Sequence, residues 1–419
     1  MSTGAKTDSN QNFWQLACIQ AASPGLAWIL LGKSFAQKYG YDATITSILF
    51  ANLILWFIAF SIVSMTAQNR NNAIENAEEY TGIFGGKLAA LISMAIFPIW
   101  SIMQMEAAAE IFTNFYGAEF NSTITVIGLT AAIVISFIIY NRGIRIIRQL
   151  TTAFLPILIL YSLYSLLSIG EFNWISRGTL FSFPCTFAYV SASFPGMVNL
   201  PTFFRHSRSL YDSYLALTIM TLLVIFFQIS SLWIAPDFLA DYLSKTGSEP
   251  FSFVVILFYS AFMGMLLICN NLVNIYFSYP SWMLIIPSIK KNTMLLIVGL
   301  CVAIFYGLIR TFPDLSLFFK TYQIIADNFI ANLGIVLLII FGFRLVVRHR
   351  PQPLEKVIST TSWIIGCIAT ILATIQVTCL PPALIGMGAT IGFFGLVMFI
   401  EEPFWSWKKL RHLIQNRKP

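Results

Sequence analysis

Apolar runs long enough to cross a membrane recur along nearly the whole sequence, and this recurrence restricts the possible folds more than any other feature. An α-helix needs about 20 mostly apolar residues to span the hydrocarbon core of a bilayer. The chain has 419 residues, of which 57% are hydrophobic and only 10% are charged. One soluble core cannot bury that much apolar surface. The sequence therefore predicts an all-α polytopic membrane protein, with no room between the runs for a soluble catalytic domain.

The runs predict about twelve membrane-spanning helices. A hydropathy window of about 19 residues places them at 13–36, 44–66, 86–115, 123–141, 149–169, 181–204, 211–235, 250–278, 293–311, 322–347, 360–380 and 382–400. We expect residues 1–12 to form a cytoplasmic tail, and 13–347 to form a ten-helix transport core. Residues 348–419 are expected to add two transmembrane helices and a basic cytoplasmic tail.

The basic residues fall mainly on one side of the predicted membrane. If the N-terminus is cytoplasmic, the outer ends hold only six of the 25 Lys and Arg residues, namely Lys33, Lys38, Arg177, Lys245, Arg310 and Lys320. Basic residues concentrate in cytoplasmic loops, so we expect both termini inside and the protein in the inner or plasma membrane. The net charge of +7 then reflects topology. Because the basic residues are spread over separate loops, we expect no nucleic-acid partner.

Two of the runs carry Pro and Gly at their centres. The first is AASPGLAW, from Ala21 to Trp28, and the second is SASFPGMVNLP, from Ser191 to Pro201. Pro and Gly are common in membrane helices, so one such run alone would mean little. Two matched runs, five spans apart, instead predict discontinuous helices 1 and 6 and a 5+5 inverted repeat of the LeuT-like kind, followed by two C-terminal helices.

A break in mid-membrane frees backbone groups that hydrocarbon cannot satisfy, so it survives only beside a polar cavity or a ligand. We therefore expect Ser23 and Gly25 to border the substrate. The carbonyl groups of Ala22 and Gly25 are candidates for binding a cation.

The third run contains Trp100 and Gln104, which are four residues apart and so lie on one helix face. An indole can stack on a flat ring, and an amide can pair with adjacent N–H and C=O groups. This combination predicts a site for a planar heterocycle. The alternative is that both side chains only pack between helices and bridge them.

Intramembrane carboxylates are costly and often functional. Glu106 is therefore a candidate for proton coupling, whereas Glu110 lies nearer the outer end and is expected to reach the interface. In the eighth run, Asn270, Asn271 and Asn274 need polar partners in hydrocarbon. A polar cavity or hydrogen bonds between helices would supply them.

These residues resemble the nucleobase:cation symporter-1 family, which includes cytosine and hydantoin permeases, within the amino acid–polyamine–organocation superfamily. The resemblance lies in Trp100 with Gln104, in NLPTFFRHSRS from Asn199 to Ser209, and in NNLVNIYFS from Asn270 to Ser278. The plan of the spans extends it to nearly the full length.

The resemblance implies that Trp100 stacks on the substrate, that Gln104 and an asparagine of the eighth span, Asn271 or Asn274, bind it, and that the sixth span closes the pocket near Phe194 and Gly196. It also implies a sodium site made of carbonyl groups in the first break and hydroxyl groups in the eighth span.

The sequence departs from that sodium site. Ile268, Cys269 and Asn270 occupy the region where Thr or Ser would be expected, although the Asn270 oxygen could serve sodium. Coupling to Na⁺ or H⁺ and facilitated transport therefore all stay open, and no organic cofactor is expected.

The sequence thus predicts a secondary active transporter that moves a small planar heterocycle, a nucleobase or a related compound, across the lipid bilayer by alternating access. An amino-acid permease of the same fold is the main alternative, because a broken first span can also hold a carboxylate. An enzyme is disfavoured, since His206, His349 and His412 all fall at cytoplasmic ends and no HExxH or GxSxG motif is present.

Overall fold

The computed structural model describes residues 11–22, 27–116, 122–141, 143–167, 178–232, 250–347, 353–376 and 380–401. Regular structure in these ranges is helical, and an isolated bridge joins Gln11 to Ser207. The helices are α1 (Phe13–Ala21), α2 (Ala27–Tyr39), α3 (Tyr41–Asn69), α4 (Ala73–Tyr116), α5 (Ser122–Asn141), α6 (Ile144–Leu167), α7 (Phe183–Asn199), α8 (Pro201–Phe204), α9 (Leu210–Ser231), α11 (Pro250–Ile285), α12 (Lys291–Thr311), α13 (Pro313–Val347), α14 (Pro353–Ile375) and α15 (Pro382–Glu401).

The predicted membrane class is confirmed. Within the described ranges, eight helices are long and apolar enough to cross a bilayer, and two shorter apolar helices, Gly128–Asn141 and Pro382–Met398, accompany them. Each of the twelve ranges expected from hydropathy overlaps at least one helix. The count of twelve spans itself stays a prediction, because not all of these helices meet the length and hydropathy that spanning requires.

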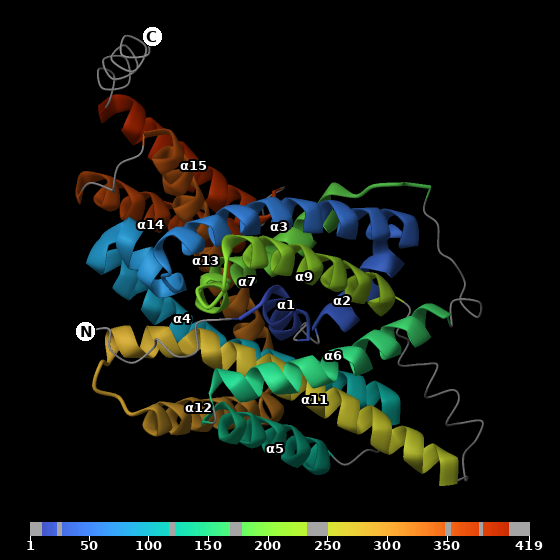
Figure 1. Ribbon diagram of the computed structural model, residues 1–419. Helices are drawn as coiled ribbons and strands as arrows, with labels where there is room; N and C mark the ends of the chain where they lie inside the picture. Colours follow the sequence, from blue (N-terminus) through green and yellow to red (C-terminus); the bar gives the residue numbers. More distant parts are fainter. Residues whose placement is uncertain are drawn as a thin grey trace.

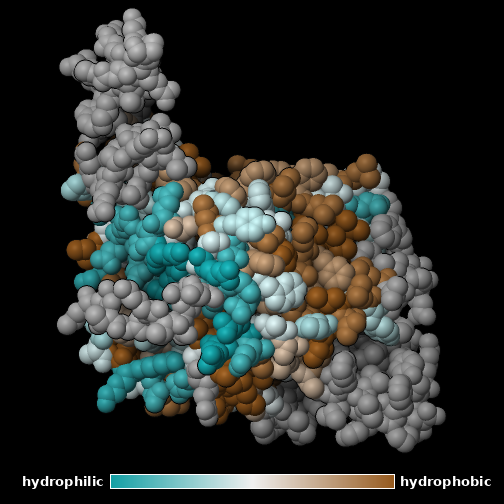
Figure 2. All heavy atoms as spheres, viewed as in Figure 1, coloured by the Kyte–Doolittle hydropathy of each residue, from teal (hydrophilic) through white to brown (hydrophobic). Residues whose placement is uncertain are grey.

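Large apolar side chains cover the outside of the bundle. Examples are Phe57 on α3, which is 59% exposed, Leu160 on α6, which is 67% exposed, and Leu296 on α12, which is 62% exposed. In Figure 2, apolar residues cover much of the right-hand side of the visible face, and hydrophilic residues gather on its left. Such an apolar belt suits lipid as the surrounding solvent.

Helix α1 lies at the centre of the bundle, between α9 and α6 (Figure 1). Leu16, Cys18 and Ile19 are completely buried. Asn12 caps the helix start, where its side chain accepts a hydrogen bond from the Gln15 N–H at 3.0 Å. The first span is therefore built of two helices, α1 and α2, and a connection at 23–26 that lies outside the described residues.

The sixth span differs from the expectation. Helix α7 runs without interruption through Pro195 and Gly196 and ends at Asn199, so the break is not at Pro195 and Gly196. Pro195 removes only the hydrogen bond to the Ser191 carbonyl. The helix ends later because Pro201 has no N–H for the Met197 carbonyl, which instead accepts the Leu200 N–H at 3.2 Å. The short α8 then follows.

Helix α4 also has two parts. Gly82 has φ 77° and ψ 177°, a conformation that only glycine adopts readily, and it separates a first segment with Glu75 and Glu79 from the long apolar segment. The long segment packs along α11 and α13, while α14 and α15 pack on each other and on α13.

Candidate functional site

Trp100 and Asp327 form a polar contact between two of the described spans. The indole Nε1 of Trp100, on α4, donates a hydrogen bond of 2.8 Å to Oδ1 of Asp327, on α13. Asp327 lies near the midpoint of the apolar helix Asp314–Phe343, and the Gln323 side chain one turn earlier also bonds to it. The contact fixes the orientation of an aromatic ring that is only partly buried.

Gln104 lies one helical turn after Trp100 and is also partly buried, so α4 presents the two side chains on one face, as the spacing predicted. Asp327 was not anticipated from the sequence. The available signal was an acidic residue within the predicted span 322–347, in the string IIADNF.

The asparagines of α11 differ in how their amides are satisfied. Nδ2 of Asn270 donates to the Leu266 carbonyl of its own helix at 3.2 Å. Asn271 is 1% exposed, and neither its Nδ2 nor its Oδ1 has a hydrogen-bond partner. Asn274 is 9% exposed. Because α11 packs along α4, these amides belong to the helix next to Trp100 and Gln104.

Other expected site residues lie apart from Trp100 or outside the described residues. Phe194 is 1% exposed and packs in the core against Gly334 of α13, where an added Cβ would lie 3.2 Å from its ring. Gly196 faces open space. Ala22 is buried and caps the C-terminal end of α1, while Ser23 and Gly25 lie outside the described residues.

Cys269, expected near the ion site, is completely buried on α11. Among the described residues, no cluster of three or more His, Cys, Asp or Glu side chains could hold a metal ion. The sodium site implied by the resemblance therefore stays a prediction.

Glu106 is engaged in an ion pair. Its Oε1 lies 3.4 Å from Nε of Arg310, on α12. The Arg310 Nε also donates to the Tyr306 hydroxyl at 3.2 Å. The glutamate is therefore compensated by a neighbouring base, and it is separated from Trp100 by six residues along α4.

Aromatic rings connect Trp100 to one end of the bundle. Trp100 contacts Phe97 edge-on, with 5.0 Å between the ring centroids. Phe97 stacks on Phe277 of α11, with a centroid distance of 5.7 Å. Phe277 meets Phe203 of α8 at 5.1 Å, and Phe203 stacks on Tyr276 at 4.6 Å. These contacts form a continuous series of rings from Trp100 to Tyr276.

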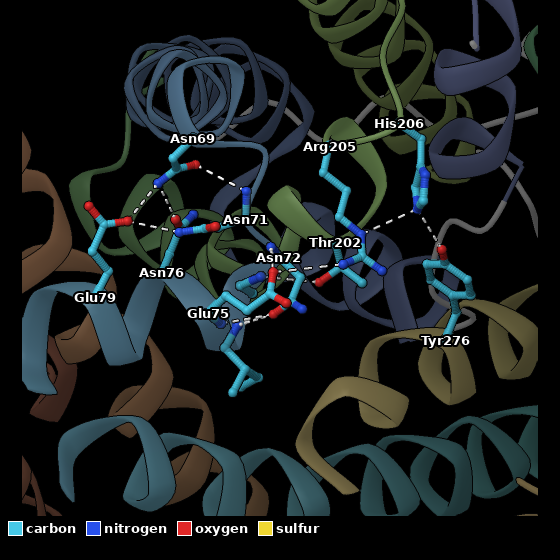
Figure 3. A network of polar contacts seen from close by, with 12 residues as sticks. Asn69, Asn71, Asn72, Glu75, Asn76, Glu79, Thr202, Arg205, His206 and Tyr276 are labelled. Carbon is cyan, nitrogen blue, oxygen red and sulfur yellow. Dashed lines mark hydrogen bonds and ion pairs between the residues drawn. The ribbon is translucent and has the colours of Figure 1, made fainter. Parts of the chain in front are cut away.

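At that end, polar side chains of α4, of the residues directly after α8 and of α11 form the inner network, which we define as Glu75, Arg205, His206 and Tyr276 (Figure 3). Nη1 of Arg205 lies 3.8 Å from the Glu75 carboxylate, and its Nε donates to Nε2 of His206 at 3.3 Å. His206 Nε2 lies 2.9 Å from the Tyr276 hydroxyl. A second group beside it centres on Glu79, which accepts from Asn69 and Asn71.

The chain before α1 joins the same end. The Gln11 N–H donates to the His206 carbonyl, and the Arg208 N–H donates to the Gln11 carbonyl, both at 3.0 Å. Arg70, after α3, donates to the carbonyl groups of Arg205 and Ser207. The ends of α1, α3, α4, α8 and α11 that meet here are thereby linked.

The fold belongs to a class of membrane transporters. No protein-family model matches the chain, and no curated protein matches it significantly. Solved structures do match it over most of its length. They are transporters rather than enzymes.

One match is the structure of Mhp1, a nucleobase-cation-symport-1 family transporter, in a closed conformation with bromovinylhydantoin bound. It has a TM-score of 0.65 and 15% sequence identity, and the match covers 93% of this chain and 91% of that one. A Na⁺-coupled sialic acid symporter matches with a TM-score of 0.57, 12% identity and coverages of 92% and 89%. The structure of MhsT in complex with L-phenylalanine matches with a TM-score of 0.56 and 14% sequence identity. That match covers 92% of this chain and 96% of the other. At these identities the likeness establishes the fold, and the chain is an integral membrane protein with that fold.

Proposed function

We propose that this protein is a secondary active transporter that moves a small planar ring compound, such as a nucleobase or a hydantoin-like heterocycle, by alternating access and with a coupling cation. The observation that carries the proposal is the indole of Trp100, held by Asp327 at 2.8 Å and followed one turn later by Gln104. The fold shared with Mhp1, whose structure contains bromovinylhydantoin, supports it.

The chemistry of the candidate site fits a ring better than a flexible chain. A ring stacked on the indole gains about 0.5–1.5 kcal/mol beyond the burial of its area. The Gln104 amide and the unpartnered Asn271 amide both offer a donor and an acceptor. Heterocycles with adjacent N–H and C=O groups are complementary to such amides.

The wider arrangement is part of the same proposal. We infer a ten-helix core of two inverted repeats, with α1 and α7 as corresponding helices, and with α14 and α15 as an appendage that packs on α13. Both termini are placed in the cytoplasm, and the protein in the cell membrane, on the distribution of its basic residues.

An amino-acid permease is the second candidate. It is favoured by the likeness to MhsT in complex with L-phenylalanine and by the two-part first span. In that case the ligand carboxylate would bind at the connection between α1 and α2, and Trp100 would contribute little.

The test is a thermal-shift screen of the purified protein against nucleobases, hydantoins and aromatic amino acids, because a ligand that binds only the folded state raises the melting temperature. We expect a ring compound to stabilise the wild type and Trp14→Ala, which removes an indole that is 43% exposed. The same compound should not stabilise Trp100→Ala. Equal increases of the melting temperature in Trp14→Ala and Trp100→Ala would contradict the proposal. Stabilisation of the wild type by amino acids alone would also contradict it.

A further inference from the structure

Glu106 and Asp327, two carboxylates within the described spans, differ in their partners. Glu106 is compensated by Arg310 at 3.4 Å and lies within the electrostatic reach of Lys320. Asp327 makes no ion pair in the part of the chain that the structure describes. It is bonded by two neutral donors, the Trp100 indole and the Gln323 amide.

The helices around Asp327 bring no charge to it. Helix α13 packs against α3, α4, α7, α12, α14 and α15. Over their described residues, no charged group of these helices acts on Asp327. Two titratable groups of these neighbours have other partners, since Glu106 faces Arg310 and Cys367 of α14 contacts Asn332.

We propose that Asp327 is a proton-binding site and that this proton is the coupling ion of the transporter, an inference that rests on the function proposed above. A carboxylate at mid-membrane without a basic partner is costly, and a proton neutralises it without any further ligand. Sodium would instead need several oxygen ligands around it, and the structure gives Asp327 only two N–H donors.

The indole links the proton to the substrate. When Asp327 is ionised, Trp100 donates a charge-assisted hydrogen bond, which is about twice as strong as a neutral one. When Asp327 is protonated, the bond becomes neutral and the indole is held less tightly. The proton is taken from water on one side of the membrane and returned to water on the other, and no other bond forms or breaks. Ring binding and proton binding are then coupled through one side chain.

The test of the proton site needs no substrate. Infrared difference spectra of the purified, ligand-free protein across pH report the carbonyl band of a protonated carboxylic acid. We expect Asp327→Asn to lose a band that the wild type shows, and we expect Asp314→Asn, a change at the exposed start of the same helix, to keep it. If Asp327→Asn fails to fold, Asp327→Glu should retain the band at a displaced frequency. A band that persists in Asp327→Asn, or one that disappears in Glu106→Gln instead, would overturn the inference.

A transport arm separates this inference from the proposed function. In proteoliposomes, an imposed pH gradient should drive uptake of the ring compound that stabilises the wild type. A sodium gradient should have no effect on that uptake. Asp327→Asn should reduce the pH-driven accumulation at least tenfold, whereas Asp314→Asn should leave it unchanged. Uptake driven by sodium would overturn the proton site and leave the proposed function intact. A titrating Asp327 band in a protein that no ring compound stabilises would support the proton site and overturn the function.

Discussion

Asn271 is 1% exposed, and neither polar atom of its side chain has a hydrogen-bond partner. A buried amide in this condition costs about 1–3 kcal/mol of stability. Its neighbour Asn270 spends its Nδ2 on the Leu266 carbonyl instead. The Asn270 amide therefore bonds within α11, whereas the Asn271 amide is available to a ligand.

Asn271→Leu separates stability from binding. The substitution removes an unsatisfied amide with little change of volume, so the ligand-free protein should melt at a higher temperature while losing stabilisation by the ring compound. Asn270→Leu is the matched control and should lower the melting temperature, because it breaks an existing hydrogen bond. Thermal melts of both variants, with and without the compound, give the answer. Destabilisation of the two proteins by similar amounts would show that the Asn271 amide is satisfied.

At the same scale, spacing alone predicted that Trp100 and Gln104 share a face, because helical geometry is local. The partner of Trp100 could not be predicted, since Asp327 lies 227 residues further along the chain and the contact depends on how α4 and α13 pack. Glu106 was predicted as a candidate for proton coupling from its depth in the membrane. Its ion pair with Arg310 is likewise a contact between helices, and it gives a physical reason to prefer Asp327.

Among the elements, α8 and the inner network connect the chain's start to the centre of the bundle. Phe203 stacks on Tyr276 at 4.6 Å, and the Tyr276 hydroxyl lies 2.9 Å from Nε2 of His206. Arg205 is a donor only, so its 3.3 Å hydrogen bond requires a lone pair on that nitrogen. The contacts hold α8 against α11, and we expect them to close this end of the bundle.

Tyr276→Phe should loosen this closure and leave the ring contacts in place. Loss of one hydrogen bond, about 0.5–1.5 kcal/mol, should raise the reactivity of Thr202→Cys, on α8, roughly 2- to 12-fold toward a thiol reagent. Thr202 is 1% exposed, so slow labelling is expected without the second change. Tyr214→Phe is the control, because its hydroxyl bonds to Ser64 at 2.7 Å between α3 and α9. Mass spectrometry of the labelled peptide gives the rates, and equal rates in both backgrounds would argue against a closing role for Tyr276.

The positions of the helices were predictable because hydropathy along the chain reports directly on burial in lipid. The interruptions within the helices were less predictable. Pro195 and Gly196 were expected to break the sixth span, yet α7 continues to Asn199, because a proline costs one hydrogen bond and the surrounding packing holds the helix. Gly82, which does interrupt α4, lies outside the range expected to span the membrane and carried no such signal.

For the molecule as a whole, orientation depends on the distribution of basic residues rather than on any contact. Cysteines introduced at Arg145 and Lys290, both exposed, should therefore react only with a reagent on the cytoplasmic side. A cysteine at Asp314, in the exposed first turn of α13, should react only from outside. Impermeant thiol reagents applied to intact cells and to inverted vesicles distinguish the two. Labelling of all three positions from one side would contradict the topology.

The central claim is that a planar ring binds against Trp100, and the structure of the protein with the compound identified by thermal shift tests it most directly. The account predicts ligand density stacked on the Trp100 indole, with Gln104 and Asn271 within hydrogen-bonding distance of the ring substituents. The Asp327 contact to Nε1 should be kept or visibly rearranged around the same density. Density at the connection between α1 and α2, with no contact to Trp100, would contradict the claim and favour the amino-acid permease.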